Sequence, residues 1–492
     1  HVLRGAGFKL RGLDVDLSLA EFLCRPGQRP ADVAGLAMRH LHEEFPKLDK
    51  KPTAQALHED LLGRARAEYR LTPILVKDMD AHETRAIHDD LELPLARVLT
   101  QMEESGIAVD ASELDRLDSM HAERQSEVAA RAFAEIGGEE INLGSPKQLQ
   151  TVLFDRLGMP PTRKTKTGHS TDAESLTDLY AKTGHPFLQA LLEHRDVTKL
   201  RQIIETLRKS VTENGRIHTT LSQNVAATGR LASSNPNLQN IPARTEAGRQ
   251  IRGAFHASEG FESLLTADYS QIEMRIMAHL SGDEGLIQAF RDGEDLHSFV
   301  ASQVFGTPVD QVTSEERSKT KAISYGLAYG LSAFGLARQL HIPQSEAQAL
   351  RAQYFERFGG VQDYLHESVE RARSLGYTET LLGRRRYLPE LTSDSRQRRE
   401  NAERVALNSP IQGSAADIIK LAMLRVDHAL TKTGAASRLV LQVHDELIVD
   451  VAPGEIDLVR DIVREGMEGA YELSVPMDVS VGVGHSWLEA AH

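Results

Sequence analysis

The chain has 492 residues, of which 40% are hydrophobic and 26% charged, and its net charge is −14. This length exceeds what one hydrophobic core normally supports, so two or more domains are expected. A single cysteine, Cys24, excludes an intramolecular disulfide and a thiolate metal cluster, and it favours a reducing, cytoplasmic compartment. No apolar run reaches membrane-spanning length, so no membrane partner is expected.

Positive charge is concentrated in short segments although the whole chain is acidic. By itself the net charge argues against a nucleic-acid partner, because phosphates are bound by lysine and arginine. Seven arginines nevertheless lie between positions 384 and 404, and a second cluster comprises Arg163, Lys164 and Lys166. Either cluster alone is more typical of a solvated face. Binding is local, however, so the acidic net charge does not exclude a polyanionic partner.

The first part of the chain has the patterns of helices. Helix-like stretches occur at 32–46 and 53–68. Asp110 is placed to cap a helix that runs to about Phe133. Apolar residues at helical spacing predict another long helix over 186–211.

The character of the chain changes after residue 216. Short strand-like runs occur at 216–222, 263–267, 438–443 and 447–451, while 284–375 is mostly helical. A sheet made from these strands must be assembled from distant segments, with a helical insertion between them. The pattern is that of an α+β protein.

The segment ADYSQIEMR, residues 267–275, places Asp268 at the end of an apolar run. Ser270 and Glu273 then stand three apart, which is the spacing of a helix capping box. A capping box is the simpler interpretation of this segment taken alone.

The segment LVLQVHDELIVDV, residues 439–451, predicts a hairpin with a tight turn at His444 and Asp445. A polar turn is the simpler interpretation, but favoured two-residue turns contain glycine, which is missing here. If the strands leading to Asp268 and Asp445 are neighbours, their carboxylates converge and need cations. Two Mg²⁺ ions about 3.5–4 Å apart suit such a pair and can clamp the oxygens of a phosphoryl transfer.

The segment ERSKTKAISYGLAYG, residues 316–330, predicts a helix with one unusual face. Four side chains spaced four apart share that face: Arg317, Lys321, Tyr325 and Tyr329. The cations suit a polyphosphate and the rings suit a base or sugar. An ordinary amphipathic helix is the alternative. Gly326 and Gly330 weigh against it and indicate close approach to the backbone.

Two further segments are rich in polar side chains. TGRLASSNPNLQNIP, residues 228–242, has the composition of a surface loop, but its amides and Arg230 can also contact groove edges or phosphates. NSPIQGSAADIIK, residues 408–420, places Asn408 and Gln412 four apart at a predicted helix start, again suited to polar contacts.

These five segments, in this order, resemble motifs of the family A DNA polymerases. DYSQIEMR, RSKTKAISYGLAYG and QVHDE resemble the three polymerase motifs of the family, and the match covers roughly residues 90–492. The overall match resembles the large fragment of the bacterial members. The resemblance implies an α+β right-hand fold, in which an antiparallel palm sheet carries helical fingers and a helical thumb.

The resemblance also implies a domain order. Residues 1–90 would be a short, truncated remnant of a 3′–5′ exonuclease-like domain, without proofreading activity because their aspartates do not match the family pattern. The thumb would span 91–215, the palm 216–282 and 401–492, and the fingers 283–400.

Site residues are implied position by position. Asp268 and Asp445 resemble the metal-binding carboxylates, with the main-chain carbonyl of Tyr269. The residues implied to bind the incoming nucleotide are His297, Arg317, Lys321, Tyr325, Tyr329, Gln271 and Glu273. The residues implied to contact DNA are Arg230, Asn237, Gln239, Arg404, Asn408, Gln412 and His444. Among these, Arg317 and Lys321 would hold the triphosphate, and Glu273 would block a ribose 2′-hydroxyl.

The implied activity is template-directed DNA synthesis for replication or repair, by a monomer that acts on primer–template DNA and dNTPs. The primer 3′-hydroxyl would attack the α-phosphorus with two Mg²⁺ ions, for which Mn²⁺ can substitute. A bacterial, nucleoid-associated location in the cytoplasm is implied too. Position 325 is tyrosine where many relatives have phenylalanine, which implies weaker discrimination against dideoxynucleotides.

Three alternatives remain open from the residues. A two-metal nuclease also needs clustered carboxylates, but it does not need the cationic and aromatic face of 316–330. A non-catalytic DNA-binding relative is expected to lose Asp268 or Asp445, and both are present. The sequence does not separate a DNA-templated enzyme from one that prefers an RNA template. An assay that compares a DNA template with an RNA template distinguishes them.

Overall fold

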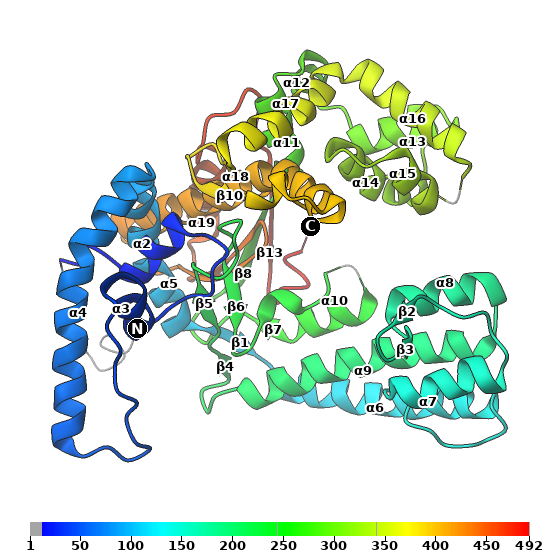
Figure 1. Ribbon diagram of the computed structural model, residues 1–492, viewed down its shortest axis with the longest axis horizontal. Coiled ribbons are helices and arrows are strands. Elements are labelled where there is room, and N and C mark those ends of the chain that lie inside the picture. The colour runs from blue at the N-terminus through cyan, green and yellow to red at the C-terminus, as the bar shows by residue number, and fades with distance from the viewer. Residues whose placement is uncertain (1–11, 244, 341, 492) are drawn as a thin grey trace.

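A four-stranded antiparallel sheet lies at the centre of the molecule, with helices around it (Figure 1). The structure is a computed structural model that describes residues 12–243, 245–340 and 342–491. The strands in spatial order are β11 (Arg438–Val443), β12 (Glu446–Val451), β8 (Ser263–Tyr269) and β13 (Val479–Gly484). Glu446 of β12 pairs with Asp268 of β8, 178 positions earlier, so the sheet is assembled from distant segments as predicted. The predicted strand run 216–222 is not part of this sheet, because its residues form β4 (Arg216–Ile217) and β5 (Thr220–Ser222) in two smaller sheets.

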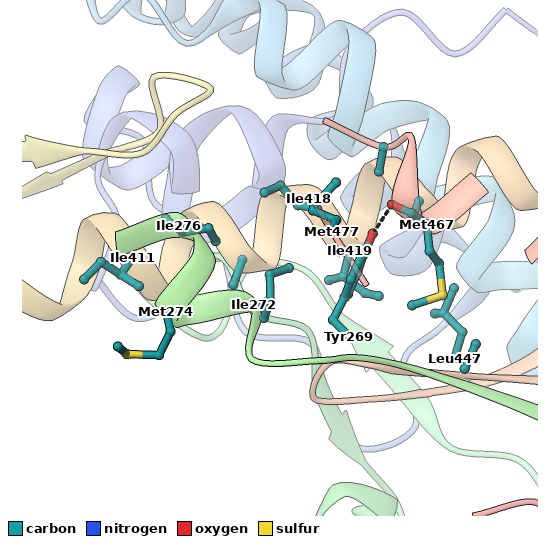
Figure 2. Close-up of a cluster of buried hydrophobic side chains, with 14 of the residues drawn as sticks. Tyr269, Ile272, Met274, Ile276, Ile411, Ile418, Ile419, Leu447, Met467 and Met477 are labelled. Carbon is teal, nitrogen blue, oxygen red and sulfur yellow. Dashed lines mark hydrogen bonds between the residues drawn. The ribbon is translucent and has the colours of Figure 1, made fainter. Parts of the chain in front are cut away.

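Both faces of this sheet are buried, which explains why its strands are apolar runs. Leu265 and Ala267 belong to one core and Leu264 to another, because successive side chains of a strand point to opposite faces. The first core packs against α11 (Ile272–Ser281), α18 (Arg396–Thr433) and α19 (Ile456–Glu468). Figure 2 shows this core around Tyr269, whose hydroxyl donates to the carbonyl of Met467 at 2.6 Å.

One helical lobe precedes the sheet in the chain. Its helices are α6 (Ala111–Ala134), α7 (Pro146–Gln150), α8 (Ala173–Thr183) and α9 (Pro186–Ser210). The preceding helix, α5 (Leu93–Ser105), packs instead on α18 and β11 beside the central sheet. Asp110 accepts hydrogen bonds from the first turn of α6, so the predicted cap and the predicted helices are confirmed. The hairpin of β2 (Lys164–Thr165) and β3 (Gly168–His169) lies beside α8 and α9, and carries the second basic cluster (Figure 1).

A second helical lobe is inserted between β8 and the hairpin of β11 and β12. Its helices are α12 (Glu284–Arg291), α13 (Leu296–Phe305), α14 (Ser314–Ala328), α15 (Ala333–Leu340), α16 (Gln344–Arg357) and α17 (Gly359–Leu375). It meets the first lobe through Arg338 on α15, which pairs with Glu174 at 2.6 Å and Asp178 at 3.5 Å on α8. These side chains are exposed, so the contact is worth about 0–1 kcal/mol per pair.

The N-terminal segment forms a separate cluster of helices. They are α2 (Leu17–Cys24), α3 (Val33–Leu41), α4 (Ala54–Ala81) and the π-helical turn η1 (Ile87–Glu92). Two aspartates of this region have structural partners, because Asp16 caps α2 and Asp78 pairs with Arg25 at 2.7 Å. Helix α4 is longer than the predicted stretch 53–68 because it continues through Pro73.

Short strands and turns connect these parts. One small sheet contains β1 (Ile107–Val109), β4 (Arg216–Ile217) and β7 (Phe255–His256). Two hairpins are β5 (Thr220–Ser222) with β6 (Ala232–Ser234), and β9 (Tyr377–Glu379) with β10 (Arg385–Tyr387). The remaining helical pieces are η2 (Thr151–Arg156), η3 (Leu238–Asn240), α10 (Glu246–Gly253), η4 (Val309–Gln311) and η5 (Pro389–Thr392). In the described part of the chain, no helix combines the length and apolarity needed to cross a membrane.

The prediction of a helix start at Asn408 is wrong. Helix α18 has 38 residues and begins twelve positions earlier, at Arg396. It continues through Pro410, which is tolerated here because tertiary packing buries this part of the helix on several sides. Asn408 and Gln412 therefore lie on the middle of a long helix, near the sheet.

Candidate active site

The two predicted carboxylates meet at one end of the central sheet. Asp268 lies near the end of β8, and Asp445 lies in the two-residue turn between β11 and β12. Glu446 pairs in register with Asp268, and the Tyr269 amide donates to the Asp445 carbonyl at 3.4 Å. His444 has φ of 55°, the left-handed conformation that tight turns between twisted strands require. The predicted convergence is confirmed.

Burial makes both carboxyl groups weaker acids than an exposed aspartate. Burial, reinforced by Asp445 and Glu446, raises the pKa of Asp268 to about 7, although Lys321 opposes the shift. Burial likewise raises the pKa of Asp445 to about 6, although Arg230 opposes it. The cations of the protein therefore do not compensate these two acids fully, and a further cation is needed to hold both ionised.

In protein free of divalent metal, Asp268→Asn is expected to raise the unfolding temperature at pH 8 by a few degrees. The pKa of about 7 in the folded state exceeds the value of about 3.9 in an unfolded chain. The stability from the extra bound proton is therefore present at pH 4 and is lost as the pH rises through 7. Asparagine avoids that loss, so the gain should shrink toward pH 4. Thermal unfolding in chelator across this range measures it, and a gain independent of pH contradicts it.

Glu446 is a functional candidate that the sequence analysis did not select. Its carboxylate accepts from the Trp487 indole at 3.0 Å and lies 3.5 Å from the Arg252 guanidinium. Arg252 in turn lies over the Trp487 ring, 4.1 Å from its centroid. The only signal in the sequence was its place directly after Asp445. A third carboxylate is thus held beside the pair by the C-terminal tryptophan.

The donor set fits a hard divalent cation bound partly by substrate. Among the residues that the structure describes, no three metal-ligating side chains form a preformed centre. Asp268, Asp445 and the Tyr269 carbonyl are oxygen donors, and Mg²⁺ typically takes one or two carboxylates and completes its shell with water and phosphate oxygens.

The capping box predicted for Ser270 and Glu273 does not form. Helix α11 begins after Gln271, whose φ is 56° and whose side chain makes no cap. The carboxylate of Glu273 instead accepts from Arg230 and from the Tyr329 hydroxyl, both at 2.6 Å. The buried carbonyl oxygen of the Gln271 side chain has no hydrogen-bond partner. Glu273 therefore joins three of the segments selected from the sequence, namely 228–242, 267–275 and 316–330.

Helix α14 brings its predicted face toward the carboxylates. Lys321 lies near enough to lower the pKa of Asp268, whereas Tyr329 stands just beyond the helix end. Arg317 donates two hydrogen bonds to the carboxylate of Asp295, which caps α13. A guanidinium already held by a carboxylate has the geometry to hold a phosphate instead.

Two aromatic groups complete this face of the second lobe. The ring of His297 lies 5.6 Å from that of Tyr325, and burial lowers the pKa of His297 to about 4. Both ring nitrogens of His297 are buried without a partner. The close approach expected at Gly326 comes from the chain itself, because a Cβ there would lie 2.9 Å from Leu331.

The other predicted DNA contacts are spread over two segments. Asn237 caps η3, and the Gln239 amide lies 3.5 Å from Gln442. Arg404, Asn408 and Gln412 are carried by α18, and His444 is exposed at the hairpin turn. The structure therefore brings Arg230 and His444 close to the carboxylates but leaves Asn237 in a local structural role.

The arginine-rich strip 384–404 does not form one patch. Arg384 is buried, and Arg385 pairs with Glu83. Arg396 pairs with Glu400 at 2.7 Å. Arg386 donates to the Ser409 hydroxyl at 3.0 Å, and its pKa is lowered by burial. Only part of the predicted positive surface therefore faces solvent.

An antiparallel sheet that carries paired aspartates at one end, with a helical lobe on either side, is the right-hand fold that the resemblance implies. Residues 111–489 match the model of DNA polymerase family A. The chain is 56% identical to DNA polymerase I of Mycobacterium tuberculosis (strain H37Rv), over 100% of the chain and 55% of that protein. It is 42% identical to DNA polymerase I of Geobacillus stearothermophilus, over 99% of the chain and 57% of that protein. The chain belongs to DNA polymerase family A.

A solved structure agrees with this assignment. The POL domain of Pol1 from M. smegmatis, in complex with DNA primer-template and dNTP, superposes with a TM-score of 0.94. The two are 56% identical, and the match covers 100% of this chain and 84% of the other. The chain spans a little over half the length of the curated relatives that it matches.

Proposed function

We propose that this chain is a template-directed DNA polymerase that adds dNTPs to a primer 3′-hydroxyl, in replication or repair synthesis. The observation that carries the proposal is the meeting of Asp268 and Asp445 opposite the cationic face of α14. Relatives named DNA polymerase I support it, as does the related POL domain with its primer-template and dNTP.

Asp268, Asp445 and the carbonyl of Tyr269 would hold Mg²⁺, as two ions for which Mn²⁺ can substitute. When bound, these ions lower the pKa of the primer hydroxyl and stabilise charge on the transferring phosphate. The protein's own contribution is to fix both carboxylates at the sheet end, which costs no reorganisation during the reaction, while the bound cations would hold them ionised.

The incoming dNTP is bound by α14 and its neighbours. Arg317 exchanges the carboxylate of Asp295 for a phosphate, and Lys321 bridges the triphosphate toward the aspartates. His297 lies beside the same phosphates, and Tyr325 stacks on the nucleotide. Glu273, held by Arg230 and Tyr329, closes the space that a ribose 2′-hydroxyl would need, and Gln271 precedes it in the same turn.

Primer–template DNA is bound by a single copy of the chain along α18 and the hairpin turn. Arg230, Gln412 and His444 contact the primer terminus. Asn408 and Arg404 contact the template side, and Asn237 and Gln239 contact the duplex backbone.

The proposed domain order has four parts. They are a remnant exonuclease-like region at 1–90, the thumb at 91–215, the palm at 216–282 and 401–492, and the fingers at 283–400.

Primer extension with dNTPs tests the proposed function directly. A primed DNA template should be extended only in the presence of a divalent cation. Degradation of the primer without extension would favour a two-metal nuclease, and binding without either reaction a non-catalytic relative. The same primer on an RNA template measures the share of reverse transcription.

Tyr325→Phe is expected to reduce kcat/KM for dideoxynucleotides by roughly tenfold to a hundredfold more than for dNTPs. The phenolic hydroxyl can supply a hydrogen bond that a nucleotide without a 3′-hydroxyl lacks, and such a bond to a charged group is worth about 1.5–3 kcal/mol. Single-nucleotide addition with both substrates measures the ratio. Equal losses for both would refute this role of Tyr325.

A further inference from the structure

A cluster of four buried charges lies next to the segment that carries Arg230, outside the residues assigned above. Glu92, Arg384, Asp417 and Lys420 are almost wholly inaccessible to solvent. They come from three places in the chain, namely the junction of η1 with α5, the tip of the hairpin of β9 and β10, and the middle of α18. We call them the buried charge cluster.

Hydrogen bonds saturate the carboxylates of this cluster. Glu92 accepts from Lys420 at 2.6 Å, from Gln223 at 2.6 Å and from Arg384. Burial pushes the pKa of Glu92 up most strongly, but Lys420 and Arg384 hold it at about 2. Asp417 accepts from Arg384 Nε at 2.9 Å and from the Thr380 hydroxyl at 2.7 Å. Arg384 therefore joins both acids through one planar group.

The segment that carries Arg230 rests directly on this guanidinium. Gly229 has φ of 82°, and a Cβ at that position would lie 2.6 Å from Arg384 Nε. Only glycine tolerates both this backbone conformation and this distance. The next residue is Arg230, which donates to Glu273 at 2.6 Å.

Helix α18 is held against the same group at the residue after Gln412. A Cβ on Gly413 would lie 2.5 Å from the Thr380 side chain and 3.2 Å from the Thr228 carbonyl oxygen. Thr380 in turn accepts from the backbone amide of Arg384 at 3.1 Å. The hairpin tip, α18 and the segment 228–230 thus share one contact point, and Arg384 lies at its centre.

We propose that Arg384 is a positioning residue for DNA synthesis. It contacts no substrate. Held by Asp417 and Glu92, it supports Gly229 and thereby fixes Arg230 against Glu273 and the primer terminus. The inference rests on the proposed function, in which Arg230 contacts the primer terminus. Displacing a positioning group by about 1 Å can cost up to a hundredfold in rate.

The test is a double-mutant cycle on the kcat of single-nucleotide addition, at saturating dNTP and primer–template. Arg384→Lys keeps the charge but loses the planar group that reaches both carboxylates. It is expected to lower kcat at least about tenfold in the wild-type background, and less than about twofold in Arg230→Ala. Loss of stability alone would lower kcat by the same factor in both backgrounds.

Arg216→Lys is the control, because Arg216 also lies near a buried carboxylate, Asp450, but donates to the backbone carbonyls of Ser105 and Gly106 and not to segment 228–230. It should leave kcat unchanged in both backgrounds. If Arg384→Lys does not fold, Asp417→Asn replaces it in the same double-mutant cycle, because asparagine has the shape of the aspartate that holds Arg384.

Equal losses in the two backgrounds, or no loss in either, would overturn the role of Arg384 while leaving the polymerase assignment intact. A wild-type kcat for Arg230→Ala itself would instead remove the primer-terminus role of Arg230, and with it the positioning proposal. The two failures are therefore distinguishable.

Discussion

Asp445→Ala is expected to lower single-turnover primer extension by roughly a thousandfold or more. Metal-held carboxylates contribute several kcal/mol of charge stabilisation in phosphoryl transfer, and each 1.36 kcal/mol is a factor of ten in rate. Asp445 lies in a turn whose neighbours are Asp268 across the sheet and Glu446 along the chain, so no other side chain takes its position. Rapid-quench measurement with a saturating dNTP gives the rate of the chemical step.

Asp457→Ala is the matched control, since this exposed carboxylate on α19 loses the same group far from the sheet end. It should extend primers at the wild-type rate. Fluorescence anisotropy with primed DNA should show that Asp445→Ala still binds the duplex, because the phosphates are bound by cations elsewhere. If Asp445→Ala extended primers at a rate within tenfold of wild type, the two-carboxylate mechanism would be wrong.

Arg317→Ala is expected to lower kcat/KM for dNTPs by about a hundredfold. A hydrogen bond to a charged group is worth about 1.5–3 kcal/mol, and the guanidinium already presents two donors to one carboxylate. Most of the loss should appear in KM, because the triphosphate is bound in the ground state as well as in the transition state. Steady-state incorporation of one nucleotide over a range of dNTP concentrations separates the two constants.

Two variants control for this effect. Arg371→Ala removes an exposed arginine that pairs with Glu379 at 3.0 Å in the same lobe, and it should not change KM. Asp295→Asn keeps the α13 cap but releases the charge that holds Arg317, so it should not reproduce the loss. If Arg371→Ala weakened dNTP binding as much as Arg317→Ala, the assignment of Arg317 to the triphosphate would be wrong.

The sequence by itself determined the features that depend on local periodicity. Apolar runs predicted the strands of the hairpin, and helical spacing predicted α6 and α9 with close to their observed ends. Steps of four placed Arg317, Lys321 and Tyr325 on one face of α14, because helix geometry alone sets that relation. The convergence of Asp268 and Asp445 needed one further assumption, that their strands are neighbours.

Only the tertiary structure decided which groups are partners. Glu273 has the spacing of a cap, yet its partners Arg230 and Tyr329 lie 43 and 56 residues away. Arg384 has the sequence surroundings of a surface arginine, yet it is buried between acids 292 and 33 residues away. Local patterns show which face of an element is apolar, but the energy of a buried charge depends on distant segments, because Coulomb and desolvation terms act through space and not along the chain.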